Sequence, residues 1–305
     1  MIGVTLNYKE FLKKFPDDKK CIEHFIELRF PEGVSCPNCK RKEVKKRKDN
    51  PKFYHCNLCN YDLSIFKDTI FEKTSTNIRS WFYAIHLFLN AKKGISAKQL
   101  QREIGVTYKT AWRMLHQIRK AMEDKNHDNL YEAIVEIDET YVGGKPRKSN
   151  IRDKDKGGKG LKRGRGTKMT PIIAVVDREN RKVFAKVALR NKKGHRLSGK
   201  QLIDVLNQVC KGKNVVISDE YRGYNELKYT DYIHLRIDHN KMFADGIVHT
   251  NTIESFWAIV KRAIYGIYHR ISVKYLQDYI NEFSFRYNHR NVDEGFDLIL
   301  RNAIL

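Results

Sequence analysis

The chain has 305 residues and 41% hydrophobic content, which is enough for a folded core and for more than one domain. Its 59 Lys and Arg residues outnumber 36 Asp and Glu residues and give a formal net charge of +23, which favours nucleic acid as a partner over an anionic membrane. No apolar run approaches the ~20 residues of a membrane span, and the first residues do not form a signal peptide, so we expect a cytoplasmic protein. The alternative is a basic soluble protein without a polyanionic partner.

The first 35 residues are predicted to form a short helical lead. The segment Cys21–Phe30 carries apolar residues at helical spacing, and Pro31 to Gly33 ends the pattern. Cys21 and the distant Cys210 both lie in apolar helical contexts, so we expect both to be buried thiols.

Residues 36–70 form a basic module with paired cysteines. Two CxxC motifs, Cys36 to Cys39 and Cys56 to Cys59, are separated by 16 residues, which is the pattern of a four-thiolate zinc ribbon. Four protein ligands leave no open position, so this Zn²⁺ is expected to be structural. A segment this short cannot bury a core of its own, and the metal should supply much of its stability. The flanking run Lys40–Lys48 gives the module a basic rim suited to DNA.

Residues 77–125 are predicted to be helical and to contain a helix-turn-helix. Ser96 is the expected N-cap of one helix, Gly105 supplies the positive φ of the turn, and Thr107 is the expected N-cap of the next helix. Without the positive charge of the chain, a plain helical hairpin would be the default interpretation.

The second of these helices is the predicted recognition helix. Its apolar face comprises Ala111, Leu115 and Ile118, and Trp112 is expected in the core. A helix in this position lies in the major groove of DNA. The predicted DNA contacts on it are Tyr108, Lys109 and Arg113.

Residues 131–305 change to strands that alternate with helices, which predicts an α/β domain with one mixed sheet. Strands are expected over Ala133–Asp138, Ile172–Asp177, Val183–Leu189, Asn214–Ser218 and Tyr232–Ile237. Helices are expected over Ser198–Cys210, Thr252–Tyr265 and Val273–Arg286.

A basic insert over residues 143–169 interrupts this domain. It is rich in Gly, Lys and Arg and almost devoid of apolar residues. Such a composition is typical of a solvated loop, and in this chain it also suits an arm that contacts DNA phosphates. The candidate contacts are Lys162, Arg163 and Arg165.

Two aspartates each follow a predicted strand. Alternation places Glu136 and Asp138 on one face of the first strand and Val135 and Ile137 on the other, and Asp219 follows the run Val215–Ser218. For either aspartate alone, a turn residue after a strand would be the simpler interpretation. Together they predict a pair of carboxylates at the ends of strands in one sheet.

A third carboxylate lies on the helix over Thr252–Tyr265. Asn251, Glu254 and Lys261 share one face of this helix, so Glu254 would lie across from the two aspartates and Lys261 would contact a phosphate. A competing interpretation is a capping box with Asn251 as the N-cap and Glu254 folded back to the backbone. Acidic groups in a protein that binds a polyanion indicate divalent metal, with two Mg²⁺ or Mn²⁺ ions held by carboxylates.

The chain resembles bacterial insertion-sequence transposases of the DDE type, in the branch with an N-terminal zinc ribbon that is related to the Merlin transposons. The resemblance rests on VEIDETYVGGK at 135–145, ISDEYRGY at 217–224, HTNTIESFWAIVKRAIYGIYHRIS at 249–272 and EFSFRYNHR at 282–290. It covers nearly the whole chain.

The resemblance implies an RNase H-like catalytic domain, a mixed sheet flanked by helices, preceded by the zinc ribbon and the helix-turn-helix. The first two metal-binding positions of the family fall on Asp138 and Asp219. The third metal-binding position is Glu or Asn in the family, followed by a Lys, and it falls here on Glu254 or on Asn251. We favour Glu254 as the metal ligand, with Asn251 as support and Lys261 as the Lys that follows.

The reaction implied is hydrolysis at the ends of an element and attack of the freed 3′-hydroxyls on target DNA. The implied partners are the terminal inverted repeats and target DNA, in the nucleoid, and joining two ends implies a homodimer or larger assembly. A DNA-binding regulator without activity and a stand-alone RNase H-like nuclease are the alternatives. The acidic trio argues against the first, and the two extra DNA-binding modules argue against the second.

Overall fold

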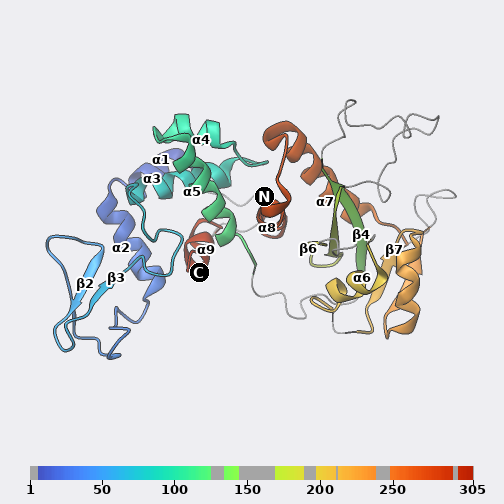
Figure 1. Cartoon of the computed structure of the whole chain (residues 1–305), viewed down its shortest axis with the longest axis horizontal. Coiled ribbons are helices and arrows are strands. Elements are labelled where there is room, and N and C mark those ends of the chain that lie inside the picture. The colour runs from blue at the N-terminus through green and yellow to red at the C-terminus, as the bar shows by residue number, and fades with distance from the viewer. Residues whose placement is uncertain are drawn as a thin grey trace, which may run out of the picture. The chain divides into compact units, whose positions relative to one another are not determined.

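The computed structural model describes residues 6–124, 134–143, 169–188, 197–210, 212–237, 248–290 and 295–304 (Figure 1). The chain forms two compact units. Unit 1 comprises Met1–Glu123 with His289–Leu305, and unit 2 comprises Asp124–Asn288. Within the described ranges, no helix is long and apolar enough to cross a lipid bilayer.

Unit 1 contains a helical core built largely from aromatic side chains. Its helices are α1 (Tyr8–Lys14), α2 (Asp18–Arg29), α3 (Ile78–Asn90), α4 (Ala97–Ile104), α5 (Tyr108–Ala121) and α9 (Gly295–Asn302). The expected helical lead is therefore two helices, with Cys21 fully buried in the second. After α2, Gly33 takes a φ of +92°, the conformation expected where the helical pattern ends.

The C-terminal helix α9 belongs to unit 1 and packs on α2, α3 and α5. Phe296 lies 5.5 Å from the ring of Phe15 and 5.6 Å from that of Phe82, and Asp297 is 2.8 Å from Nε2 of His24. The expectation that the catalytic domain extends to residue 305 therefore differs from the structure. The reason is aromatic packing between segments far apart in sequence, which local periodicity does not report.

The cysteine-rich part of unit 1 is a three-stranded antiparallel sheet. Its strands are β1 (Val44–Lys46), β2 (Phe53–Cys56) and β3 (Asp62–Ser64), in the order β1-β2-β3. The strands are short, and most of their residues are partly or fully exposed. This agrees with a module too small to bury a core of its own.

Two helices and the turn between them form where the sequence predicts them in the segment 95–120. Ser96 caps α4 through the amide of Gln99, and Thr107 caps α5 through the amide of Thr110. Between the two helices Gly105 has a φ of +67°, in the left-handed region. The predicted apolar face of α5 is buried.

Unit 2 is organised around a mixed five-stranded sheet with the order β6-β5-β4-β7-β8. The strands are β4 (Ile134–Val142), β5 (Thr170–Asp177), β6 (Lys182–Val187), β7 (Val215–Ser218) and β8 (Ile233–Arg236). β4, β5 and β6 pair antiparallel, whereas β7 pairs parallel with β4 and β8 parallel with β7. β5 lies between β6 and β4 and is buried along its whole length, and its residues 171–176 form a continuous apolar run.

Helices cover both faces of this sheet (Figure 1). One face carries α6 (Gly199–Leu206) and the 3₁₀ helix η4 (Arg222–Tyr229), and it buries Val135 and Ile137 of β4. The other face carries α7 (Asn251–Ala263) and α8 (Leu276–Asn288), which pack over β4, β5 and β6. A π-helical segment η5 (Ile264–Tyr268) and a 3₁₀ turn η6 (Val273–Tyr275) join those two helices. The expected RNase H-like arrangement, a mixed sheet flanked by helices, is confirmed.

The main difference from the sequence lies in β4. The prediction ends this strand at Asp138, but β4 continues to Val142, and Glu139 to Val142 pair with residues 170–173 of β5. Asp138 is therefore in the middle of a strand. The sequence does not predict this longer strand, because Glu139 and Thr140 are polar and yet buried.

Candidate active site and zinc centre

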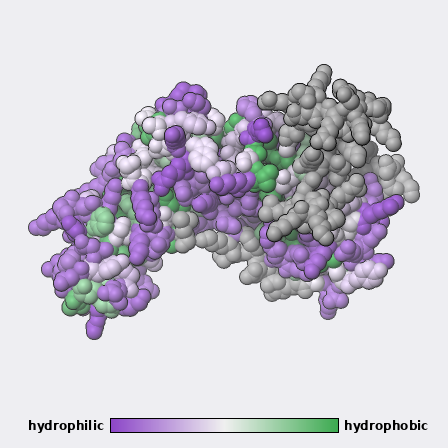
Figure 2. All heavy atoms as spheres, viewed as in Figure 1, coloured by the Kyte–Doolittle hydropathy of each residue, from purple (hydrophilic) through white to green (hydrophobic). Residues whose placement is uncertain are grey.

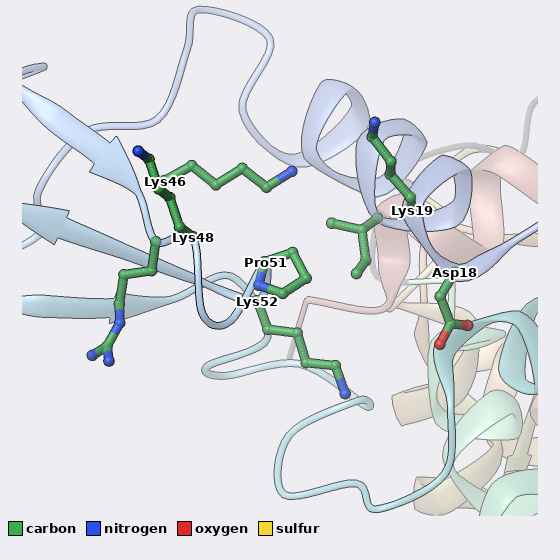
Figure 3. A pocket seen from close by; sticks show the side chains of 8 residues that line it. Asp18, Lys19, Lys46, Lys48, Pro51 and Lys52 are labelled. Carbon is green, nitrogen blue, oxygen red and sulfur yellow. The ribbon is translucent and has the colours of Figure 1, made fainter.

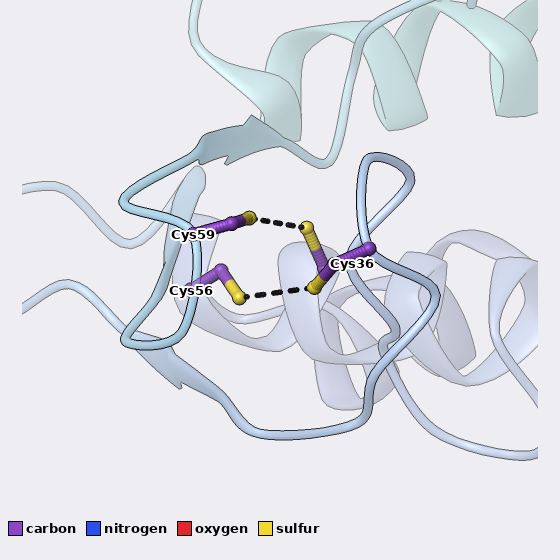
Figure 4. Close-up of side chains that lie close together, drawn as sticks. Cys36, Cys56 and Cys59 are labelled. Carbon is purple, nitrogen blue, oxygen red and sulfur yellow. Dashed lines mark hydrogen bonds between the residues drawn. The ribbon is translucent and has the colours of Figure 1, made fainter.

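The four cysteines of the ribbon form one compact cluster (Figure 4). Their sulfur atoms all lie within 4.8 Å of one another, with Cys36 3.5 Å from Cys59 and Cys39 3.6 Å from Cys56. The residues that follow the two CxxC motifs, Lys40 and Asn60, have φ of 61° and 53° and close each tight turn. This donor set and its spacing fit a structural Zn²⁺.

Backbone amides support the thiolate form of one cysteine in each CxxC motif, Cys36 and Cys56. Hydrogen bonds from the backbone of Cys39 and then Asn38 contribute to lowering the pKa of Cys36 to about 7. In the second motif, the backbone hydrogen bond of Cys59 is the main cause of the lowered pKa of Cys56. Because zinc binds thiolates, these two cysteines favour the form that binds the metal, whereas burial and hydrogen bonds from the neighbouring thiols raise the pKa of Cys39 to about 12.

Removing one ligand should release the metal. We expect wild-type protein to bind about one zinc per chain, and Cys36→Ala protein to lose it together with the ordered structure of residues 36–70. Metal analysis by mass spectrometry checks the first result and limited proteolysis the second. Cys210→Ala, which removes a buried thiol of unit 2, is the matched control and should keep its zinc. A Cys36→Ala protein that retains zinc and fold would refute the site.

The predicted first and second carboxylates come together on neighbouring strands of unit 2. In the parallel ladder of β4 and β7, Glu136 lies opposite Ile217, and continuing this register by two residues places Asp219 opposite Asp138. The side chain of Asp219 accepts a hydrogen bond of 2.9 Å from the amide of Tyr221, which orients it in the turn after β7.

Charge and burial act strongly on Asp138. Burial first, and then the negative charges of Glu139 and Asp219, raise the pKa of Asp138 to about 8, while the positive charge of Lys261 opposes this shift. In the antiparallel ladder Asp138 lies opposite Ala174, so its side chain is on the face of the sheet that α7 covers. Asp138, Asp219 and Lys261 are thus within electrostatic reach of one another.

The predicted third carboxylate is held at the start of α7. Glu254 is exposed, and its Oε1 accepts a 2.9 Å hydrogen bond from the hydroxyl of Thr250. The competing capping box is wrong, because Thr250 is the N-cap residue, makes no side-chain cap, and Asn251 is already helical. Glu254 therefore has no capping role that accounts for its presence.

Glu254 does not join the two aspartates in one compact set. Over the described ranges, the cysteine cluster is the only group of three or more potential metal ligands whose donor atoms all lie within 4.8 Å. The structure thus places Asp138 on β4, Asp219 directly after the adjacent strand β7, and Glu254 on the helix that covers the face of Asp138.

Two buried glutamates of β4 flank Asp138, and sequence analysis assigned a role to neither. Glu136 is on the α7 side, where its carboxylate accepts hydrogen bonds from Arg178 Nε at 2.6 Å and from the amide of Ile253 at 2.8 Å. Glu139 accepts a 2.9 Å hydrogen bond from the hydroxyl of Tyr224 on the opposite side of the sheet. The alternation that singled out Asp138 also placed Glu136 on the same face, and that was the available signal.

The predicted recognition helix, α5, exposes part of the set of residues expected to contact DNA. Lys109 and Tyr108 are exposed in the first turn of α5, and Lys98 of α4 lies 5.1 Å from the Tyr108 ring. Arg113, the third residue of this set, is half-buried and donates to the carbonyl of Glu72 at 3.2 Å. Its guanidinium therefore holds α5 against the segment before α3.

Unit 1 also contains a basic groove of about 530 Å³ between α2 and the turn that joins β1 to β2 (Figure 3). Its lining residues are Asp18, Lys19, Ile22, Lys46, Arg47, Lys48, Pro51 and Lys52. Arg47 is neutralised by Asp49 and Asp62, at 2.6 and 2.7 Å, and Asp18 accepts from the amide of Arg79. Four lysines give the groove its remaining positive charge. On the face of the molecule shown in Figure 2, most of the coloured surface is hydrophilic.

The proposed DNA contacts of the insert, Lys162, Arg163 and Arg165, lie outside the described residues.

In comparisons with known proteins, both the zinc-ribbon segment and most of unit 2 match domains of transposases. Residues 129–288, just over half of the chain, match the ISXO2-like transposase domain, and residues 16–62 match a transposase zinc-ribbon domain. An uncharacterized protein in the transposable element ISH50 of Halobacterium salinarum is 28% identical over 286 residues, which cover 90% of this chain and 92% of that protein. An uncharacterized transposase-like protein of Haemophilus influenzae is 24% identical over 98 residues, 32% of this chain and 79% of that protein.

Among solved structures, a pre-cleavage Mos1 transpososome is similar at 12% identity, with a TM-score of 0.28, over 73% of this chain and 79% of that chain. A Mos1 transposase paired-end complex with left transposon end is similar at 13% identity and a TM-score of 0.27. Similarity at these TM-scores carries no argument, and the assignment rests on the domain matches. The chain therefore belongs to the ISXO2-like transposase family, the DDE transposases of the IS1595 group of insertion sequences.

Proposed function

We propose that Asp138, Asp219 and Glu254 are the catalytic carboxylates of this transposase and that they hold two divalent cations, Mg²⁺ or Mn²⁺. The observation that carries the proposal is the position of Asp138 on β4 within electrostatic reach of Asp219, the residue that follows the adjacent parallel strand β7, on the face covered by the helix that bears Glu254 and Lys261. Carboxylate oxygens are the ligands these hard cations prefer. When bound, the cations activate a water or a 3′-hydroxyl and stabilise the leaving oxygen.

Each residue has a distinct part in this proposal. β4 holds Asp138 rigidly within the sheet, and the turn after β7 orients Asp219 through the Tyr221 amide. Lys261 is exposed two helical turns beyond Glu254 and would bind a phosphate of the DNA. Asn251 lies on the same face and either supports Glu254 or replaces it as the third ligand. No Ser or Tyr nucleophile is needed, because the reaction forms no covalent protein–DNA link.

The DNA substrates are the terminal inverted repeats of the element and its target. We assign Lys109 and Tyr108 of α5 to the major groove and the basic groove of unit 1 to the phosphate backbone. The insert residues Lys162, Arg163 and Arg165 add further phosphate contacts. Because two ends must be joined, the active species is a homodimer or larger assembly on DNA in the cytoplasm. Within its family, we assign the chain to the branch related to the Merlin transposons.

A strand-transfer assay tests the reaction. Purified protein, Mg²⁺ or Mn²⁺, and duplexes of the inverted repeats that flank the gene should give joined products with a target plasmid. Binding without joining in either metal would favour the regulator, and cleavage without preference for the repeats would favour the nuclease.

Removing charge from the basic groove should weaken DNA binding without changing its sequence preference. Lys46→Ala with Lys48→Ala removes two phosphate contacts, so the slope of log affinity against log salt should fall by about 2. Lys9→Ala with Lys13→Ala changes the same charge on α1, outside the groove, and should leave the slope close to wild type. Fluorescence anisotropy over a salt series measures both. Equal slopes for the two double variants would contradict the groove assignment.

A further inference from the structure

We infer that Glu136 is a positioning residue that fixes the start of α7, and with it Asn251 and Glu254, against the strand that carries Asp138. The inference rests on the proposed catalytic role of those residues. It concerns a side chain that would touch neither metal nor DNA and that acts through its neighbours.

The carboxylate of Glu136 is fully buried and makes hydrogen bonds to two separate segments. Arg178, which follows β5, donates through Nε at 2.6 Å, and the amide of Ile253 in the first turn of α7 donates at 2.8 Å. A carboxylate without water needs such partners, since an unpaired buried charge costs several kcal/mol. The side chain therefore joins β4, the end of β5 and the start of α7.

Arg178 extends the same connection to His249, which lies two residues before the start of α7. Its Nη2 lies 3.0 Å from Nδ1 of His249 and donates to the carbonyl oxygen of His249. The ring of His249 in turn lies 3.4 Å from Glu136. Residues 249–253 are thus held at both ends, and Asn251 lies between the two points of attachment.

The position of this network gives it a consequence for catalysis. Glu136 is two residues before Asp138 on the same face of β4, which is roughly 6.6 Å along a strand. Glu254 follows directly after Ile253. One hydrogen-bonded connection therefore sets the distance between the strand of the first carboxylate and the helix of the third.

Stability alone does not explain the network. Apolar side chains already pack α7 on the sheet, among them Ile253, Phe256 and Trp257. A buried ion pair adds little net stability compared with apolar packing, whereas its directional hydrogen bonds define geometry. An error of ~1 Å in the placement of catalytic groups costs about a hundredfold in rate.

A second buried ion pair in unit 2 provides a matched control. Glu282 of α8 is also fully buried, and it pairs with Arg286 at 3.0 Å and with the hydroxyl of Tyr268 at 3.0 Å. These partners lie on α8 and η5. Glu136→Gln and Glu282→Gln therefore make the same chemical change, and only the first of these two pairs connects β4 to α7.

The experiment compares both variants with wild type on flanking-repeat DNA. We expect both variants to lower the thermal midpoint and to bind the DNA without Mg²⁺ as wild type does. Only Glu136→Gln should reduce kcat for strand transfer, by about a hundredfold, and raise the half-saturating Mg²⁺ concentration by about tenfold. If kcat and the Mg²⁺ requirement of Glu136→Gln stay within about threefold of Glu282→Gln, the inference is wrong.

Arg178→Lys provides a second measurement should Glu136→Gln fold poorly. Lysine keeps a positive charge beside Glu136 but lacks the second nitrogen that reaches His249. We expect the same change in Mg²⁺ requirement, with kcat lowered about tenfold. Wild-type values would overturn the inference. If Asp138→Asn fails to join DNA while Glu136→Gln joins it as wild type does, only the positioning role is rejected. If Asp138→Asn joins DNA as well as wild type does, the proposed function is rejected and this inference with it.

Discussion

Asp138→Asn protein should bind the terminal repeats as wild type does and should fail to cleave or join them. Asparagine keeps the shape of the side chain but removes the charge that a divalent cation requires. We expect the rate of strand transfer to fall by about a thousandfold or more, as for other replaced catalytic groups. Gel analysis of joined products in Mg²⁺ and in Mn²⁺ measures the loss, and equal joining by variant and wild type would end the catalytic assignment.

The same substitution should stabilise the protein when no Mg²⁺ or Mn²⁺ is added. The pKa of Asp138 is raised from 3.8 to about 8, chiefly by burial, so the folded state binds this proton more tightly than the unfolded chain does. The contribution of Asp138 to stability is therefore lost as pH rises from about 4 to about 8. Asparagine has no such dependence. The thermal midpoint of the variant relative to that of wild type should be higher at pH 8 than at pH 6. A variant less stable than wild type at both pH values would contradict this.

The second large effect should identify the third metal ligand. If Glu254 binds metal, Glu254→Gln should lower strand transfer by about a thousandfold, whereas Asn251→Ala should cost only about tenfold. The difference arises because Glu254 would contribute the charge and Asn251 only support. The reverse ranking would assign the third position to Asn251. Thr250→Val is a useful control, since it removes the hydroxyl that holds Glu254 while keeping the carboxylate. Its loss of strand-transfer rate should lie between those of Glu254→Gln and Asn251→Ala.

Features encoded by adjacent residues were predicted well from the sequence. The CxxC spacing brings four sulfur atoms together, and Ser96, Gly105 and Thr107 begin and end the helices of unit 1 where expected. The strands and helices of unit 2 also agree with the predicted order. Each of these depends on backbone conformation or periodicity within about ten residues.

Features that depend on distant partners were not predicted. Glu136 finds Arg178 42 residues later and the amide of Ile253 117 residues later, so its role has no local pattern. The continuation of β4 beyond Asp138 was missed because buried Glu139 is satisfied by Tyr224 from another element. The hydrogen bond from Arg113 to Glu72 was not predicted either, because it depends on the packing of the segment before α3.

The return of α9 to unit 1 makes unit 2 an insertion within another domain. The polypeptide leaves unit 1 after Glu123 and re-enters it at His289, so the catalytic part is tethered at both of its ends. Deletion of the last ten residues would therefore uncover Phe15 and Phe82 of unit 1 while sparing the five-stranded sheet of unit 2.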